Sequence, residues 1–305
     1  MVGCAHTYLT PATFSAQRKA SGMNCKYPMT EDQSTVFLAT ARQQIEEKRH
    51  EAEHARDLAR ACTREAKVFR ADGRTEIADR RDQQARDCLD KARYCERLRA
   101  ADEMYYALWL LLLTTGLRPS EALGAKWSDL NGKGIDVRRS LDRLGNLNAP
   151  KTDKSRRTVM LSGIVQDAID AHRRKQAALM EERREAGEPY EDNGFVFATH
   201  SGKPLDQTNV KRQKLRPLAD ASGINKQRKE AGYPPPTLYD MRHTAASTLA
   251  AKGAHISAVA ELMGHASTKM TADVYTHVMP SMRAGLPELL SDAYGLSNAA
   301  PKPVS

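Results

Sequence analysis

Apolar positions recur with a helical period from about residue 30 to the end of the first third of the chain, whereas residues 1–27 show no periodicity. A helix is expected to begin at Thr30, because Thr30 and Gln33 have the spacing of a capping box. The pattern continues to about Ala71, where the "DGRT" segment at residues 72–75 supplies a glycine stop and a new helix start. A second helical pattern runs from there to about Arg99, and it can continue into the apolar stretch "EMYYALWLLLL". The pattern therefore predicts two long helices joined by a tight turn.

Small residues repeat every seven positions along both expected helices. On the first helix they are Ile45, Ala52, Ala59 and Ala66, interleaved with Ala55, Cys62 and Phe69. On the second they are Ala78, Ala85 and Ala92, interleaved with Cys88 and Cys95. Such a seam lets helices approach closely, so residues 45–99 are predicted to form an antiparallel hairpin with arms of ~40 Å. The other positions carry nearly balanced charge, which leaves a structural spacer, an oligomer contact and a DNA-contacting arm open.

Shorter elements follow the apolar stretch. Strands are expected at residues 134–141 and 156–161, with a third short strand in the segment 193–206. Helical patterns occupy the remaining apolar segments, at residues 165–185, 207–223, 238–253, 255–265 and 284–295. The expected fold class is mainly α with a small antiparallel β-sheet (α+β).

Composition and charge narrow the class of protein. The 305 residues are 40% apolar and 28% charged, as in a soluble globular protein of about two domains. The longest apolar run, "ALWLLLL", is far shorter than the ~20 residues of a membrane span. Five cysteines without CxxC spacing indicate reduced thiols in a cytoplasm, and no metal-ligand spacing occurs. The net charge of +9 favours a polyanionic partner.

Arg118 stands where a helix start can bind an anion. Gly116 is expected to end one helix and Pro119 to begin the next, because a first helical turn tolerates proline. Arg118 would then lie near free backbone N–H groups and the positive end of the helix dipole. The alternative is a local ion pair between Arg118 and Glu121, worth roughly 0.3–0.5 kcal/mol.

Four further residues gain meaning only in combination. Arg242 lies near the start of a helix, where Asp240 can cap that helix or pair with the arginine. Lys151 lies in a loop between two expected strands, where a lysine is usually solvated. His265 follows a helix end, and Tyr275 comes ten residues later. Taken alone, His265 is explained by a favourable interaction with the dipole at the helix end, and Tyr275 is explained as a packed aromatic residue.

Together these residues fit the cleavage of a phosphodiester bond. Two arginine forks can bind the phosphate oxygens, a loop lysine can protonate the departing 5′ oxygen, and a tyrosine phenoxide can attack phosphorus. Two guanidiniums supply the positive charge, so no metal or other cofactor is expected. No carboxylate cluster suggests a two-metal nuclease.

Four segments, in this order, resemble the conserved boxes of the tyrosine recombinase (phage integrase) family. They are "TGLRPSEALGAKWSDL", "PKTDKSRRTVML", "LYDMRHTAAS" and "LMGHASTKMTADVYTHV". The resemblance covers about residues 28–44 and 101–290. It implies a role for seven residues: Arg118 and Arg242 as phosphate-binding arginines, Lys151 as general acid, His265 as a hydrogen-bonding histidine, Tyr275 as the nucleophile, Glu121 as a supporting acid, and Tyr239 at a position where the family usually has histidine.

Three features depart from the family. Tyr239 replaces a histidine that helps to deprotonate the nucleophile; a tyrosine hydroxyl is a poor base near neutrality, although it can hydrogen-bond the phosphate. Fewer than thirty residues precede the catalytic region, too few for the family's helical core-binding domain, so the chain is a fragment or works without that domain. The hairpin falls between the first two catalytic-domain helices, and the hypothesis is that it reaches across the duplex in place of the missing domain.

The expected organisation has four parts. Residues 1–27 form a poorly ordered N-terminal extension, and residues 28–44 and 100–295 form the catalytic domain. Residues 45–99 form the inserted hairpin, and residues 296–305 form a disordered tail.

The resemblance implies a site-specific DNA recombinase or integrase that cuts and rejoins DNA through a 3′-phosphotyrosine intermediate, for integration or excision of a mobile element. Its partner would be double-stranded DNA at a specific recombination site. It would act as a homo-tetramer in the synaptic complex and can be a monomer when it is alone. It would be located in the cytoplasm at the nucleoid and would not bind a membrane. The alternatives are a catalytically impaired DNA-binding relative, a coiled-coil interaction protein, and a type IB topoisomerase with the same chemistry.

Overall fold

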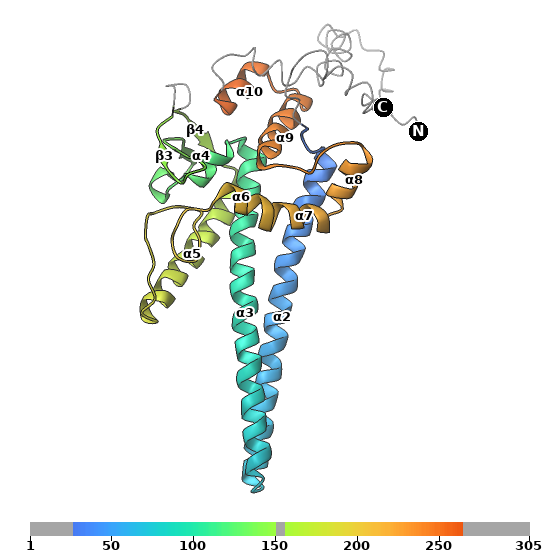
Figure 1. Cartoon of the computed structure of the whole chain (residues 1–305), viewed down its shortest axis with the longest axis vertical. Coiled ribbons are helices and arrows are strands. Elements are labelled where there is room, and N and C mark those ends of the chain that lie inside the picture. The colour runs from blue at the N-terminus through green and yellow to red at the C-terminus, as the bar shows by residue number, and fades with distance from the viewer. Residues whose placement is uncertain (1–26, 151–155, 265–305) are drawn as a thin grey trace, which may run out of the picture.

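The computed structural model describes residues 27–150 and 156–264 of the chain. A long two-helix hairpin projects from a smaller helical body (Figure 1). Its arms are α2 (Glu31–Ala71) and α3 (Thr75–Thr115), each of 41 residues and therefore about 60 Å long. The predicted two-helix hairpin is confirmed, but its arms are longer than the ~40 Å expected for residues 45–99, because the helices extend beyond both of these limits. The second arm continues as one helix through the apolar stretch.

Local sequence signals set the ends of both arms. Thr30 and Gln33 form the expected capping box at the start of α2. At the turn, Gly73 has a φ of 73° and Gly116, after α3, has a φ of 62°, both in the left-handed region that favours glycine. Neither arm contains an interruption at residues 44–45 or 99–100, where the hairpin was expected to join the catalytic domain.

The two arms pack along the small-residue seam. Nine seam residues have an exposed fraction of at most 8%: Ile45, Ala52, Ala55, Ala59, Ala66, Ala78, Ala85, Ala92 and Cys95. Ion pairs flank the seam, such as Arg56 Nη2 with Glu96 Oε1 at 2.6 Å and Arg81 Nε with Glu65 Oε2 at 3.0 Å. Because these pairs face solvent, each contributes only about 0–1 kcal/mol. Burial along the seam therefore holds the arms together.

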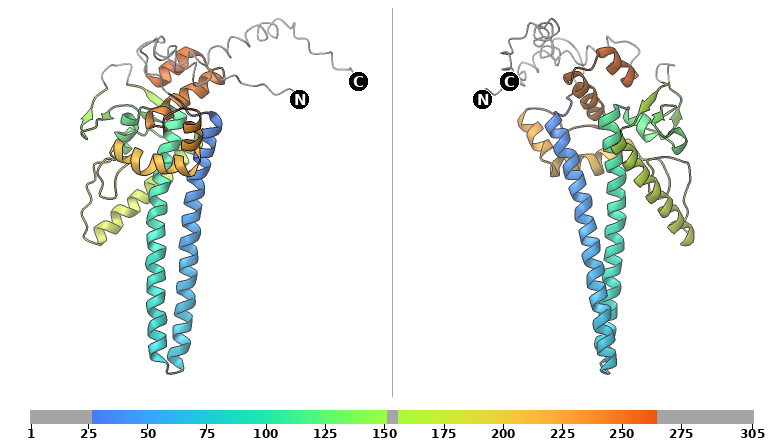
Figure 2. Two further views of the ribbon diagram at one scale, coloured as in Figure 1. Left: turned by 45° about the vertical axis from the view of Figure 1, so that its right-hand side comes forward. Right: turned by 180° about the vertical axis from the view of Figure 1, so that it is seen from behind.

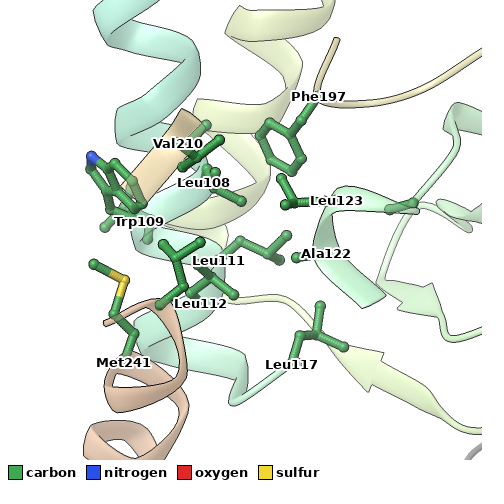
Figure 3. Close-up of a cluster of buried hydrophobic side chains, with 14 of the residues drawn as sticks. Leu108, Trp109, Leu111, Leu112, Leu117, Ala122, Leu123, Phe197, Val210 and Met241 are labelled. Carbon is green, nitrogen blue, oxygen red and sulfur yellow. The ribbon is translucent and has the colours of Figure 1, made fainter. Parts of the chain in front are cut away.

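The apolar end of α3 forms the centre of the core (Figure 3). Leu108, Leu111 and Leu112 are fully buried there, and Trp109 has an exposed fraction of 2%. The Trp109 ring lies edge-on to the Phe37 ring of α2, with 5.9 Å between the ring centroids. The labelled neighbours come from several elements and include Leu117, Ala122, Leu123, Phe197, Val210 and Met241.

The strands form two separate antiparallel pairs rather than one sheet. β1 (Gly134–Asp136) pairs with β4 (Thr158–Met160), and β2 (Ser140–Leu141) pairs with β3 (Leu147–Asn148). Between β1 and β2 the side chain of Arg139 turns to the buried Asp129, with 2.8 Å between Arg139 Nη1 and Asp129 Oδ2.

The prediction of a third strand in residues 193–206 is wrong. This segment forms only isolated β-bridges, which pair Lys126 with Phe195 and Ala198 with Pro204. The mainly α fold class with small antiparallel sheets is confirmed.

Shorter helices complete the body. They are α4 (Pro119–Leu123), η1 (Trp127–Asp129), α5 (Gly163–Glu185), α6 (Gln207–Val210), the π-helical turn η3 (Lys211–Leu215), α7 (Arg216–Ala221), α8 (Ile224–Glu230), α9 (Leu238–Ala251) and α10 (Ile256–Met263). α9 and α10 lie at the end of the molecule opposite to the hairpin tip (Figures 1 and 2). None of the helices in the described part of the chain is long and apolar enough to span a membrane.

The segment before α2 is attached to α8 and α9. Arg228 of α8 is almost fully buried, and both of its Nη atoms donate to the carbonyl oxygen of Tyr27 at 3.1 Å. The backbone N–H of Met29 donates to Thr244 Oγ1 on α9 at 2.8 Å. These bonds fix the start of α2 against the helix that carries Arg242.

Candidate active site

Arg118 lies at the entrance of α4, as the sequence predicts. Its backbone N–H donates to Glu121 Oε2 at 2.8 Å, and its Nη1 donates to Glu121 Oε1 at 2.6 Å. Its Nη2 donates to the carbonyl oxygen of Gly264 at 3.3 Å. About 30% of the Arg118 side chain is exposed, so a ligand can still reach it. The local ion pair with Glu121 and a role in anion binding are thus compatible.

Arg242 comes from α9 and is almost fully buried, with an exposed fraction of 2%. Its Nη1 donates to the carbonyl oxygen of Gly116 at 2.7 Å, and its Nη2 donates to that of Met263 at 2.5 Å. Asp240 forms a capping box with Thr237 at the start of α9. Of the two roles expected for Asp240, capping the helix or pairing with Arg242, the structure therefore shows the first.

A third arginine, Arg157, meets the other two. Its Nε donates to the carbonyl oxygen of Leu262 at 2.8 Å. Its Nη2 donates to Glu121 Oε2 at 3.0 Å, and its Nη1 to Glu121 Oε1 at 3.3 Å. Arg157 was not among the expected site residues. The sequence offers one weak signal, because Arg157, directly before β4, alternates with the buried Val159 and Leu161 and so lies on the same face as these two residues.

The three guanidiniums converge on the C-terminal end of α10. They bind three consecutive carbonyl oxygens, those of Leu262, Met263 and Gly264. The last carbonyls of a helix lack partners within the helix and carry the negative end of its dipole, so arginine side chains stabilise this end. Residues distant in sequence are thereby held at one helix end, directly before His265.

Gly264 has no space for a side chain. It has a φ of 61°, and a Cβ there would lie 2.8 Å from Arg157 Nη1. Gly116 is similarly confined, because its Cβ would lie 2.9 Å from the Met263 sulfur. Glycine at both positions allows α3 and α10 to end close to the arginines.

Glu121 carries the negative charge of this cluster. Burial alone would raise the pKa of Glu121, but the hydrogen bonds and charge of Arg157, together with the charge of Arg118, bring it below its ordinary value. The carboxylate therefore stays ionised at neutral pH. Among the described residues, three guanidiniums and one carboxylate meet here, and this net positive charge suits a phosphate group.

The other expected residues divide into two groups. Tyr239 lies on α9 one turn before Arg242, with an exposed fraction of 36%. Lys151, His265 and Tyr275 lie outside the described residues. Within the described residues no group of three His, Cys, Asp or Glu side chains has the arrangement of a metal site.

Comparison with known proteins places this site in a family. A family model described as the phage integrase family matches residues 81–282, more than half of the chain. A "Tyrosine recombinase XerC-like" protein of Caldanaerobacter subterraneus subsp. tengcongensis is 33% identical over 205 residues, covering 62% of this chain and 49% of that protein. An "Integrase" of Streptomyces ambofaciens is 33% identical over 192 residues, covering 59% and 46%.

Among solved structures, the Tn1549 transposon integrase in complex with a circular intermediate DNA is 28% identical, with a TM-score of 0.47, covering 61% of this chain and 58% of that chain. The chain spans about half the length of the curated relatives that it matches. The family match includes the segments that carry Arg118, Arg157 and Arg242, the three guanidiniums gathered at the end of α10. The chain belongs to the phage integrase family.

Proposed function

We propose that the protein is a site-specific DNA recombinase that integrates or excises a mobile element. The observation that carries the proposal is the convergence of Arg118 and Arg242 on the end of α10, directly before His265. Membership of the phage integrase family supports the same function.

The proposed reaction exchanges one phosphodiester bond for another. The Tyr275 phenoxide attacks the scissile phosphorus, the bond to the 5′ oxygen breaks, and Lys151 gives its proton to that oxygen. Arg118 and Arg242 stabilise the charge that develops on the non-bridging oxygens, and His265 donates a hydrogen bond to one of them. The 5′ hydroxyl of the partner duplex then attacks the 3′-phosphotyrosine, its proton returns to the Lys151 amine, and Tyr275 leaves as the phenoxide. The bond energy is conserved throughout, so the reaction needs no ATP.

The proposed substrate is double-stranded DNA at a specific recombination site. Several related structures contain DNA, such as the XerH recombinase "bound to palindromic difH substrate". We propose a homo-tetramer for the synaptic complex and a location in the cytoplasm at the nucleoid. The proposed catalytic domain comprises residues 28–44 and 100–295.

The hairpin is better suited to a spacer or a protein contact than to a clamp on the same duplex. Its tip lies at the N-terminus of α3, about 60 Å from Gly116 at the other end of that helix, beside Arg242. Residues 45–99 carry fifteen Lys and Arg against thirteen Asp and Glu, so the arm has little net attraction for a polyanion. If the hairpin instead clamps DNA, shortening it by whole heptads will weaken binding and reduce the salt dependence.

One experiment tests the proposed chemistry and finds the target sequence at the same time. Nicked suicide duplexes with a randomised segment, short enough for every sequence to be sampled, are incubated with the protein, and SDS-stable adducts are captured and sequenced. We expect one enriched sequence, and no adduct with Tyr275→Phe. Tight binding without an adduct would support the catalytically impaired alternative. Adducts without any sequence preference, together with relaxation of a supercoiled plasmid in a separate assay, would support a topoisomerase. No DNA binding at all would support the interaction protein.

A further inference from the structure

We propose that Arg157 is a positioning residue that releases the charge of Arg118 for the scissile phosphate. This inference rests on the proposed function. Arg157 itself is 9% exposed in its side chain, whereas Arg118 is 30% exposed. The more accessible arginine is thus the one placed to touch DNA, and Arg157 acts behind it.

The argument begins with the shared carboxylate. Glu121 lies 2.6 Å from Arg118 Nη1, and in a buried place a carboxylate this close would neutralise most of the charge of a single arginine. Arg157 donates to both carboxylate oxygens of Glu121. One carboxylate is therefore shared between two guanidiniums. Arg118, Arg157 and Glu121 together carry a net positive charge. Arg118 is the exposed one of the three, so it can bind a phosphate with that charge.

The second step concerns the geometry of α10. Arg157 Nε donates to the Leu262 carbonyl, and the guanidinium lies against Gly264, where a Cβ would approach Nη1 to 2.8 Å. One planar side chain thus fixes Glu121 and the end of α10 at once. Lysine keeps the charge but presents a single flexible ammonium group, so it cannot hold the carboxylate and the carbonyl in this fixed fork.

The third step concerns what Arg157 connects. Its carbonyl accepts from the backbone N–H of Val137, and the following residues form β4 against β1. Lys151 lies six residues before it in the sequence, and His265 follows directly after the helix end that it holds. Arg157 therefore connects β4 with the end of α10. β4 follows the loop that carries Lys151, the proposed acid, and α10 directly precedes His265, the proposed phosphate ligand.

The test separates binding from cleavage on the duplex selected above. The variants are Arg157→Lys, Arg157→Met and the double variant Arg157→Met/Glu121→Gln, with the exposed Arg174→Lys of α5 as the matched control. Single-turnover cleavage is measured at saturating protein, and DNA affinity is measured separately in the Tyr275→Phe background. A thermal melt confirms that each variant is folded.

We expect Arg157→Lys and Arg157→Met to slow cleavage by roughly ten- to a hundredfold, as for a misplaced catalytic group, with a small change in affinity. The double variant should cleave faster than Arg157→Met, because removing the carboxylate returns the charge of Arg118 to the phosphate. A folded Arg157→Lys that cleaves at the wild-type rate would overturn the proposal, and so would a double variant slower than Arg157→Met.

A second measurement does not depend on activity. Hydrogen exchange in residues 256–264 should be faster in Arg157→Met than in the wild type, while α5 stays unchanged. Wild-type protein that forms no adduct contradicts the proposed function, and this exchange then still decides whether Arg157 holds α10. Unchanged exchange at residues 256–264 would contradict the positioning role.

Discussion

Gly264→Ala is expected to destabilise the fold through two separable effects. Gly264 has a φ of 61°, and an alanine in the left-handed region costs roughly 1–2 kcal/mol. In addition, the new Cβ would lie 2.8 Å from Nη1 and 3.1 Å from Cζ of Arg157. That guanidinium is held by Glu121 and Leu262, so it cannot move without losing hydrogen bonds, and such overpacking costs about 1–3 kcal/mol.

The chain offers a matched control in Gly253→Ala. Gly253 has a φ of 84°, and nothing lies within 4 Å of the Cβ that alanine would add. This variant therefore carries the backbone cost alone, about 1–2 kcal/mol. The difference between the two variants, about 1–3 kcal/mol, measures the contact with Arg157.

The free energies of unfolding are measured by urea denaturation, followed by the helical circular dichroism signal. A third variant, Arg157→Met/Gly264→Ala, tests the cause directly, because a methionine can move away from the Cβ. Its loss should be smaller than the sum of the two single losses, as expected for residues in contact. Equal losses for Gly264→Ala and Gly253→Ala would refute the reasoning, since the contact with Arg157 would then add nothing.

Three further predictions follow from the site and the seam. The pKa of Glu121 lies below its ordinary value of 4.5, so its ion pairs stabilise the fold above about pH 4.5, and this stabilisation is lost as the pH falls through the lowered pKa. Unfolding free energies at a series of pH values should show that loss, and Glu121→Gln should remove it. Ala59→Leu should overpack the seam and destabilise the fold by about 1–3 kcal/mol in urea denaturation, whereas leucine at the exposed Arg60 should change it little. Tyr239→His should speed single-turnover cleavage near neutrality, because histidine can accept a proton there, and an unchanged rate would show that Tyr239 does not limit the reaction.

Features encoded by local periodicity could be predicted from the sequence. The capping box at Thr30 depends on two residues three positions apart, and the seam depends on a seven-residue repeat. Both signals are complete within one helix, so they do not depend on the rest of the fold. The tight turn followed from Gly73 for the same reason.

Features that depend on distant contacts could not be predicted in the same way. The segment at residues 193–206 has a strand-like composition, but it meets only single bridge partners, so no strand forms there. Arg157 has an ordinary strand-edge sequence, and its importance comes from Glu121 and Leu262, which lie 36 and 105 positions away. Arg118 and Arg242 were predicted because the family boxes contain them, and their meeting at one helix end was not encoded in either box.

The direction of the hairpin follows from the helix that it shares with the site. α3 runs from the tip to Gly116 as one helix, and the Gly116 carbonyl accepts a hydrogen bond from Arg242. Sharp helix bends occur almost only at proline, at glycine or serine pairs, or at π-bulges, and α2 and α3 contain neither proline nor glycine. Both arms are therefore expected to stay straight, so that the tip points away from the proposed phosphate site at the arginines. A partner of the tip is accordingly expected on the side of the body away from that proposed site.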